Sequence, residues 1–418
     1  MLIDLHFTKT VSTVFIRLIT IDLISIHLRK SKISKQVFIL GMVSLFTDIA
    51  SEMLYPVTPI FLTTVLGSSM ALVGVVEGIA EAIAGLLKGY FGNLSDKVGK
   101  RSVFVVIGYG ISAIVKPLPG IFQNISVVLT SRVSDRVGKG IRTAPRDALL
   151  ASYSDGNSGA VFGFHRGMDT LGAAIGPIIA LILLNFFPNN FQLIFLVAFV
   201  PSVIAVFFTL LVKDKQNSAK IKSKKNYSEF WKSAPKEYKK ILFVITLFSL
   251  VNSSDVFLIL KSKDISNSTS LAIFGYVFYN LIYAVSSYPL GGLSDKLGKQ
   301  KVFSFGLIIF SAVYFGFAFV NNIDFIWILF AFYGIYAAST EGVSKAWISD
   351  LIPNEQRGSA IGLLTMLSSF AIMLSSFLTG VLWDKFGSQI PFLISASLSL
   401  VLSIIVFKQN PLQKHFNK

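Results

Sequence analysis

The stretch that decides the fold is "GNLSDKVGKR" at residues 92–101, because the chain repeats it. A second copy, "GGLSDKLGKQK", occupies residues 291–301. When the two copies are superimposed from their first residue, seven of the first ten positions are identical. An internal repeat this far apart predicts two halves of similar structure.

The composition around the repeat predicts a polytopic membrane protein. Of the 418 residues, 53% are hydrophobic and only 14% are charged, whereas about 25% are charged in soluble domains. The apolar residues form blocks of about 20, the length that a helix needs to cross a bilayer. The predicted spans are residues 37–64, 70–93, 102–121, 124–145, 160–184, 190–212, 241–260, 269–293, 302–320, 324–347, 358–381 and 388–407. The predicted fold class is all-α integral membrane, with twelve transmembrane helices as two six-helix pseudo-repeats.

The spans also predict how the chain is divided and oriented. The expected parts are an N-terminal cytoplasmic or interfacial extension (1–35), a six-helix bundle (36–212), a basic linker (213–240), a second bundle (241–408) and a tail (409–418). The Lys-rich linker indicates the cytoplasmic side, so both termini are expected there, in a multi-pass protein of the inner or plasma membrane. An excess of Lys and Arg on the cytoplasmic side explains the net charge of +16. No nucleic acid partner is therefore predicted.

Residues 1–34 allow two interpretations: an amphipathic interfacial helix, or an extension added by a misassigned start codon. Arg17, Asp22 and His27 interrupt the apolar stretch, which argues against a thirteenth span, and no cleavage site of a signal peptide follows. The absence of Cys excludes disulfides and thiolate metal sites. The four His form no pair at ligand spacing, so neither a metal nor a cofactor is predicted.

With this layout, the two copies resemble the signature G-x-L-x-D-[RK]-x-G-[RK]-[RK] of the major facilitator superfamily of secondary transporters. The first copy matches at every position, and Gln300 replaces the last basic residue of the second. The resemblance extends over residues 37–408 and implies a transporter, not an enzyme, with a gate at the repeated loop. The implied gate residues are Gly92, Asp96, Gly99, Arg101, Gly291, Asp295 and Gly298.

A narrower resemblance concerns "SRVSDRVGKGIRTAPRDALLA" (131–151) and "GFHRGMDTLGAAIGP" (163–177). These stretches resemble a prokaryotic branch of the superfamily that carries S-D-R-x-G-K-G-x-R-x-x-P-R-D-A. Within them, Gly172, Gly176 and Pro177 are similar to the fifth-helix motif of exporters, although Ala180 and Leu181 replace its last two glycines. The likeness implies outward transport. Small residues four apart also allow close helix packing, which is the alternative.

Charged residues inside the predicted spans are candidates for function, because each is costly in hydrocarbon. They lie three or four residues apart, and so on shared helix faces: Asp48 with Glu52, Glu77 with Glu81, Arg132 with Asp135 and Arg136, and Arg166 with Asp169. We count six acids against four bases in the first half, Lys88 included. Burial disfavours the ionised form of an unpaired carboxyl, which suits a group that gains and loses a proton. The resemblance implies Asp48 and Glu52 as the first candidates for proton coupling, since antiporters of the family often carry the titrating acid on the first helix, and Glu81 is the next candidate. The alternative is a network of structural ion pairs through Arg132, Asp135, Arg136, Arg166 and Asp169.

The second half offers Asp255, Glu341 and Lys345 inside its spans. It also carries a polar aromatic stripe of Tyr276, Tyr279, Asn280 and Tyr283, which together with Asp255 is predicted to contact substrate. Ordinary placement of Tyr at the membrane interface is the alternative.

The leading hypothesis is a transporter that works by alternating access and exports a small amphipathic organic compound in exchange for protons. It would act as a monomer, with substrate, protons and the lipid bilayer as its partners. Two alternatives stay open: a proton-coupled importer of an anionic metabolite, and a lipid flippase or membrane sensor. An enzyme is not predicted, since "RVGKGIRT" lacks the first glycine of a phosphate loop.

Overall fold

The computed structural model describes residues 33–408, except Pro56, 68–69, Asn189, 216–226 and 267–268. The chain divides into two units, Met1–Lys35 and Gln36–Lys418, of which the second holds the bundle. Residues 1–32, to which most of the predicted extension belongs, and the tail 409–418 lie outside the described residues.

Six spans form the first half, and several consist of more than one helix. They are α3 (Lys35–Leu54) with α4 (Val57–Ile60) and η1 (Phe61–Val65), α5 (Met70–Val98), α6 (Arg101–Val115) with α7 (Leu118–Ile121), α8 (Ile125–Ser152), α9 (Ser158–Phe186) and α10 (Phe191–Leu210). Helix α11 (Tyr227–Ser233) lies in the linker.

The second half repeats this order. Its elements are α12 (Lys236–Ser249) with α13 (Val256–Ser266), α14 (Thr269–Leu297), α15 (Lys299–Phe319), α16 (Ile323–Asp350), η2 (Asn354–Gln356), α17 (Arg357–Phe386) and α18 (Gln389–Phe407). The predicted all-α fold of two six-helix halves is confirmed. Eight helices in the described residues are long and apolar enough to cross a membrane. Helix α8 is not among them, because it carries seven charged residues.

Local sequence explains where these helices start and stop. Asn124 and Asn322 begin α8 and α16 alike, because each side chain accepts a hydrogen bond from a backbone N–H of the first turn. Gly99 and Gly298 follow α5 and α14 with φ of +73° and +97°, which glycine adopts without strain. Both copies of the motif therefore end in a tight reversal between helices.

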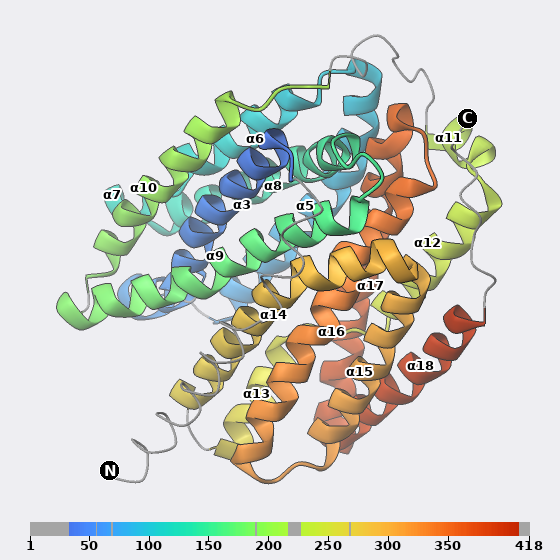
Figure 1. Cartoon of the computed structure of the whole chain (residues 1–418). Helices are drawn as coiled ribbons and strands as arrows, with labels where there is room; N and C mark the ends of the chain where they lie inside the picture. The colour runs from blue at the N-terminus through green and yellow to red at the C-terminus, as the bar shows by residue number, and fades with distance from the viewer. Residues whose placement is uncertain are drawn as a thin grey trace, which may run out of the picture. The chain divides into compact units, whose positions relative to one another are not determined.

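The two halves meet through four main helices. Helix α9 of the first half lies along α14 and also contacts α16, while α5 packs on α17 (Figure 1). Helix α8 reaches α17 as well. The second helix of each half, which carries the repeated motif, is thus paired with the fifth helix of the other half.

Candidate functional site

Two helix crossings join the halves at the end of the bundle that carries the repeated motif, which we call the motif end. In the first crossing α5 meets α17, and in the second crossing α14 meets α9. A Cβ atom built on Gly92 would lie 3.1 Å from the Cα of Gly362, and one built on Gly291 would lie 3.1 Å from the Cα of Gly163. The helices therefore touch through their backbones, as small residues allow.

The glycines on the opposite side of each crossing form a second repeat. "GAVFG" (159–163) faces the second copy of the motif, and "GSAIG" (358–362) faces the first. The interval of 199 residues that separates the two copies of the motif also separates these two stretches. This second repeat is visible in the sequence but is not among the features predicted above.

Asp96 closes the first crossing by binding the start of α17. Its fully buried carboxylate accepts hydrogen bonds from the backbone N–H groups of Gly358 (3.1 Å) and Ser359 (2.7 Å) and from the Ser359 hydroxyl (2.9 Å). Arg101 pairs with the same carboxylate at 2.9 Å and also reaches Asn354. A carboxylate at a helix N-terminus is favoured by the free N–H groups and the helix dipole.

Asp295 closes the second crossing in the same way. Its carboxylate accepts hydrogen bonds from the backbone N–H groups of Gly159 (2.9 Å) and Ala160 (2.8 Å) at the start of α9. Lys299 takes the place that Arg101 has in the first crossing, at 3.0 Å from Asp295 and 2.7 Å from Asp350. The amide of Gln300 instead donates to the carbonyl of Val406 at 2.6 Å.

Gly291→Val is expected to open the second crossing, whereas Gly292→Val leaves it closed. A side chain on Gly291 would collide with the carbonyl oxygen of Gly159, while a Cβ on Gly292 has nothing within 4 Å. Overpacking of this kind should lower the closed-to-open ratio about tenfold. The ratio can be measured from the distance between spin labels at Val98→Cys and Leu297→Cys, which are 40% and 53% exposed in a chain without Cys. A native distance distribution for Gly291→Val would contradict this.

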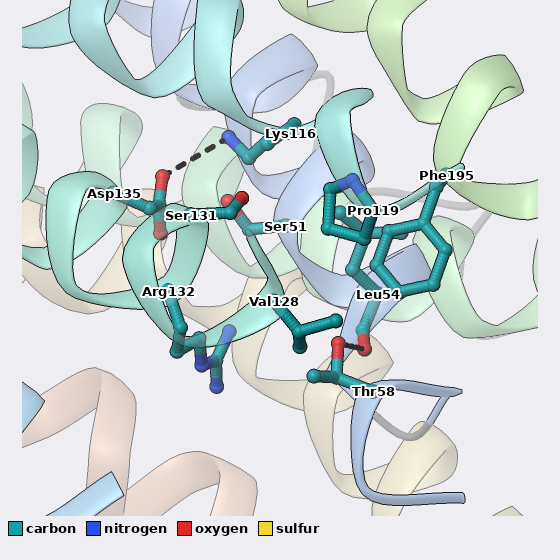
Figure 2. Close-up of a pocket in the computed structure, with 10 residues that line it drawn as sticks. All are labelled: Ser51, Leu54, Thr58, Lys116, Pro119, Val128, Ser131, Arg132, Asp135 and Phe195. Carbon is teal, nitrogen blue, oxygen red and sulfur yellow. Dashed lines mark hydrogen bonds and ion pairs between the residues drawn. The ribbon is translucent and has the colours of Figure 1, made fainter. Parts of the chain in front are cut away.

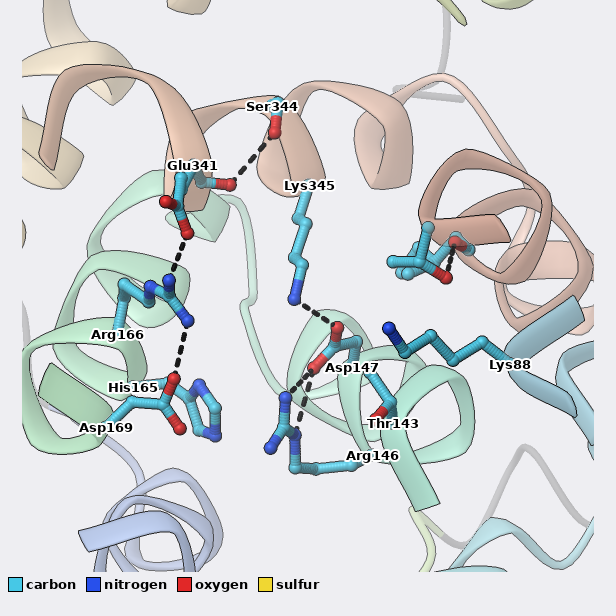
Figure 3. A network of polar contacts seen from close by, with 12 residues as sticks. Lys88, Thr143, Arg146, Asp147, His165, Arg166, Asp169, Glu341, Ser344 and Lys345 are labelled. Atoms are coloured by element: carbon cyan, nitrogen blue, oxygen red, sulfur yellow. Dashed lines mark hydrogen bonds and ion pairs between the residues drawn. The ribbon is translucent and has the colours of Figure 1, made fainter. Parts of the chain in front are cut away.

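Further into the bundle, Asp147 of α8 links the halves (Figure 3). Its side chain is fully buried and pairs with Arg146 at 2.9 Å on its own helix and with Lys345 of α16 at 2.7 Å. Arg146 also donates to the hydroxyls of Ser44 and Tyr109, both at 3.2 Å. One carboxylate therefore neutralises two cations, one from each half.

A second link between the halves starts from Arg166 of α9. Its guanidinium pairs with Asp169 at 2.6 Å, contacts Glu341 of α16, and donates to the Tyr283 hydroxyl at 2.5 Å. The carboxyl group of Asp169 also interacts electrostatically with that of Asp48 on α3. Two ionised carboxylates in such an arrangement repel each other, and a proton on one of them relieves the repulsion.

His165 lies beside this link. Its Nε2 is 2.8 Å from the hydroxyl of Ser44, which also accepts a hydrogen bond from Arg146. A cavity between α8, α9 and α16 is lined by residues of both links, among them Arg146, Arg166 and Lys345. Polar groups of both halves thus converge around one small space.

A separate cavity lies inside the first half (Figure 2). Lys116 and Asp135 face each other across it, with 3.6 Å between Nζ and Oδ1, and both residues are buried. Arg132 lines the same cavity and lies 6.0 Å from the ring of Tyr55. Arg136 interacts electrostatically with both Asp135 and Glu52. The charged network predicted from the sequence is therefore split between this cavity and the links between the halves.

The predicted surplus of acids in the first half is wrong. The count omitted Lys139 and Arg142 of α8, and this helix continues past residue 145 to include Arg146. Lys116 is a further buried cation of the first half, only 3% exposed. Lys139 is an electrostatic partner of both Asp48 and Glu52. The case for a titrating carboxyl therefore depends on the contact between Asp48 and Asp169.

The fifth-helix motif packs against the first helix. A Cβ on Gly172 would lie 2.6 Å from the carbonyl oxygen of Leu45, and one on Gly176 would lie 2.7 Å from that of Ile49. Pro177 lies inside α9 directly after the second of these glycines. These contacts favour the packing interpretation, and they place α9 beside Asp48.

The aromatic stripe on α14 faces the protein interior. Tyr279 and Tyr283 are 4% and 0% exposed, and the ring of Tyr279 lies 4.9 Å from that of Tyr333. Asn280 is buried as well, and its amide donates to the carbonyl of Tyr276 at 3.0 Å. Burial does not fit placement of Tyr279 and Tyr283 at the membrane interface.

Asp255 lies in the break between α12 and α13, where the seventh span is discontinuous. It accepts a hydrogen bond from the Tyr333 hydroxyl at 2.7 Å. Through Tyr333, Asp255 joins the same aromatic cluster as Tyr279. The side chains of Glu77 and Glu81 lie outside the described residues, so the prediction for Glu81 stays a prediction.

Comparison with known proteins identifies the family. The sequence matches the model of the Major Facilitator Superfamily over residues 40–275 and 242–418. It is 34% identical over 382 residues to an uncharacterized MFS-type transporter of Methanocaldococcus jannaschii, covering 90% of this chain and 95% of that protein.

Two solved structures have a similar fold. The human organic anion transporter MFSD10 (TETRAN) has a TM-score of 0.76 at 13% identity, covering 89% of this chain and 98% of that one. The fucose:proton symporter FucP of Escherichia coli has a TM-score of 0.72 at 13% identity, covering 89% and 97%. With its repeated motif and its two six-helix halves, this chain belongs to the Major Facilitator Superfamily of membrane transporters.

Proposed function

We propose that this transporter exchanges protons through the carboxyl pair of Asp48 and Asp169 and uses that exchange to drive a small organic compound across the membrane by alternating access. The interaction between these two carboxyls is the observation that supports coupling, because like charges so placed favour a proton on one of the two acids. Arg166 connects the pair to Glu341 in the other half. Glu52 and Glu81 are proposed as further proton carriers.

The coupling can be followed from one contact to the next. When the shared proton leaves, two negative charges face each other, and Asp169 binds Arg166 more strongly. The guanidinium is then drawn towards the first half and away from Glu341, which weakens a link between the halves. We therefore propose that protonation favours the closed motif end and that deprotonation favours its opening.

The direction of transport is proposed from the sequence. If the basic linker lies in the cytoplasm, the motif end is cytoplasmic and the structure is closed on that side. A proton taken up from outside would then be released into the cytoplasm as the motif end opens, in exchange for a compound that leaves the cell. The aromatic cluster around Tyr279 supports an amphipathic substrate.

Transport of an anionic metabolite is the second candidate. Arg146, Arg166 and Lys345 line the cavity between the halves, and all three are cations. An anion could compete there with Asp147 and Glu341 for these partners. The fold neighbour TETRAN is an organic anion transporter, as its name states, which agrees with this candidate.

The coupling can be tested without knowing the substrate. In the native protein, raising the pH is expected to increase the open fraction of the motif end about fivefold or more. Asp48→Asn combined with Asp169→Asn should remove this pH dependence, because neither position can then lose a proton. The measurement is the spin-label distance between Val98→Cys and Leu297→Cys at acidic and alkaline pH.

Asp255→Asn is the matched control, because it removes a half-buried carboxyl from the other half. It should keep the native pH dependence. A native pH response in the Asp48→Asn and Asp169→Asn double variant would refute coupling through this pair.

A further inference from the structure

The linker between the halves contributes a side chain to the first crossing. Tyr227, the first residue of α11, donates a hydrogen bond from its hydroxyl to the carbonyl oxygen of Gly89 on α5. The same hydroxyl lies 3.1 Å from the position that a Cβ on Gly362 of α17 would occupy. The tip of one linker side chain therefore touches both helices of the crossing.

Two further aromatic residues hold α11 in this place. Phe230 is fully buried, and its ring packs edge-on against Tyr238 with 5.5 Å between the centroids. Tyr238, on the first turn of α12, donates from its hydroxyl to the carbonyl of Ala360 on α17 at 3.1 Å. The linker is thus anchored to the start of α17, next to the residues that Asp96 binds.

The contacts of the Tyr227 hydroxyl connect one helix of each half. Gly89 belongs to the first half and Gly362 to the second, and the two approach only because α5 and α17 cross through their glycines. When the halves separate at the motif end, one hydroxyl cannot stay in contact with both helices. Tyr227 therefore interacts fully only with the closed crossing, and any group that binds one state better shifts the equilibrium towards it.

We propose that Tyr227 is a latch by which the linker holds the first crossing closed. This inference assumes the alternating access of the proposed function but does not depend on which residues carry the proton. The two crossings are related by the internal repeat, but the linker occurs only once, between the halves. The latch therefore makes opening of the first crossing dependent on a segment that is not itself part of either six-helix half.

Tyr227→Phe tests the latch, because it removes the hydroxyl and keeps the ring. Loss of one hydrogen bond should raise the open fraction of the motif end about two- to tenfold, measured with spin labels at Val98→Cys and Leu297→Cys at fixed pH. The matched control is Tyr153→Phe, which removes a linker contact outside the crossings, namely the hydrogen bond from the Tyr153 hydroxyl to the carbonyl of Lys213 at 2.8 Å. The control should leave the open fraction unchanged.

Two results would overturn the latch: an unchanged open fraction in Tyr227→Phe, or an equal rise in Tyr153→Phe. The melting temperature of both variants, measured in parallel, shows whether either effect comes from unfolding. Repeating Tyr227→Phe in the Asp48→Asn and Asp169→Asn background separates this inference from proton coupling. The latch predicts the same fold increase there, whether or not the pH response has been lost.

Discussion

Asp96→Asn is expected to open the motif end and to abolish transport in a protein that still folds. The native carboxylate accepts three hydrogen bonds from Gly358 and Ser359 and also pairs with Arg101. An amide replaces one acceptor oxygen by a donor and leaves the buried guanidinium without its charge partner. Breaking a buried ion pair from one side costs about 3–5 kcal/mol, which corresponds to a change of more than a hundredfold in the closed-to-open ratio. The spin-label pair at Val98→Cys and Leu297→Cys reports that ratio.

The opening caused by Asp96→Asn should be compared with that caused by Asp295→Asn, the equivalent substitution in the second crossing. Asp295 binds two backbone N–H groups and Lys299, but the second N–H belongs to Ala160, which lacks the hydroxyl that Ser359 offers to Asp96. We therefore expect the same kind of opening with a smaller amplitude. If both variants lose stability to the same extent while the motif end stays closed, the two carboxylates only anchor their loops.

Asp147→Asn is expected to cause the largest loss of stability among single substitutions in the network between the halves. The fully buried carboxylate neutralises Arg146 and Lys345 together, so its removal leaves two cations inside the bundle. The expected loss is about 3–5 kcal/mol in the free energy of unfolding, measured by thermal unfolding of the purified protein.

The matched control for this variant is Asp155→Asn. Asp155 pairs with Lys215 at 2.7 Å, but its side chain is 73% exposed, and surface pairs contribute less than about 1 kcal/mol. Adding Lys345→Met to Asp147→Asn should restore part of the lost stability, because one uncompensated cation is then gone. An Asp147→Asn protein as stable as Asp155→Asn would show that the link carries no net stabilisation.

The fold could be predicted from the sequence because its signals are local or periodic. The apolar blocks define the spans, and the repeated motif defines the two halves, whatever the packing. The partners of Asp96 and Asp295 could not be predicted in this way. They are backbone N–H groups of helices far along the chain, and only the matching interval of the "GAVFG" and "GSAIG" stretches connects them to the motif.

The candidate site was only partly predictable, for a different reason. Asp48, Arg166 and Asp169 were recognised as charges inside apolar spans. Arg146 and Asp147 were missed because the hydrophobic signal of α8 ends before them, although the helix continues to Ser152. Hydropathy shows where a chain can face lipid, whereas a helix surrounded by protein can continue through polar sequence as long as its charges are paired.

The glycine crossings determine how the two halves can move apart. Where α5 and α17 touch through their backbones, a slide along the helix axis would push side chains of neighbouring turns into the opposing carbonyl groups. Lifting the helices away from each other meets no such obstacle. The geometry at Gly92 and Gly291 therefore favours a hinge over a shear motion at the motif end. Both crossings would then separate together as the halves rotate about an axis deeper in the bundle.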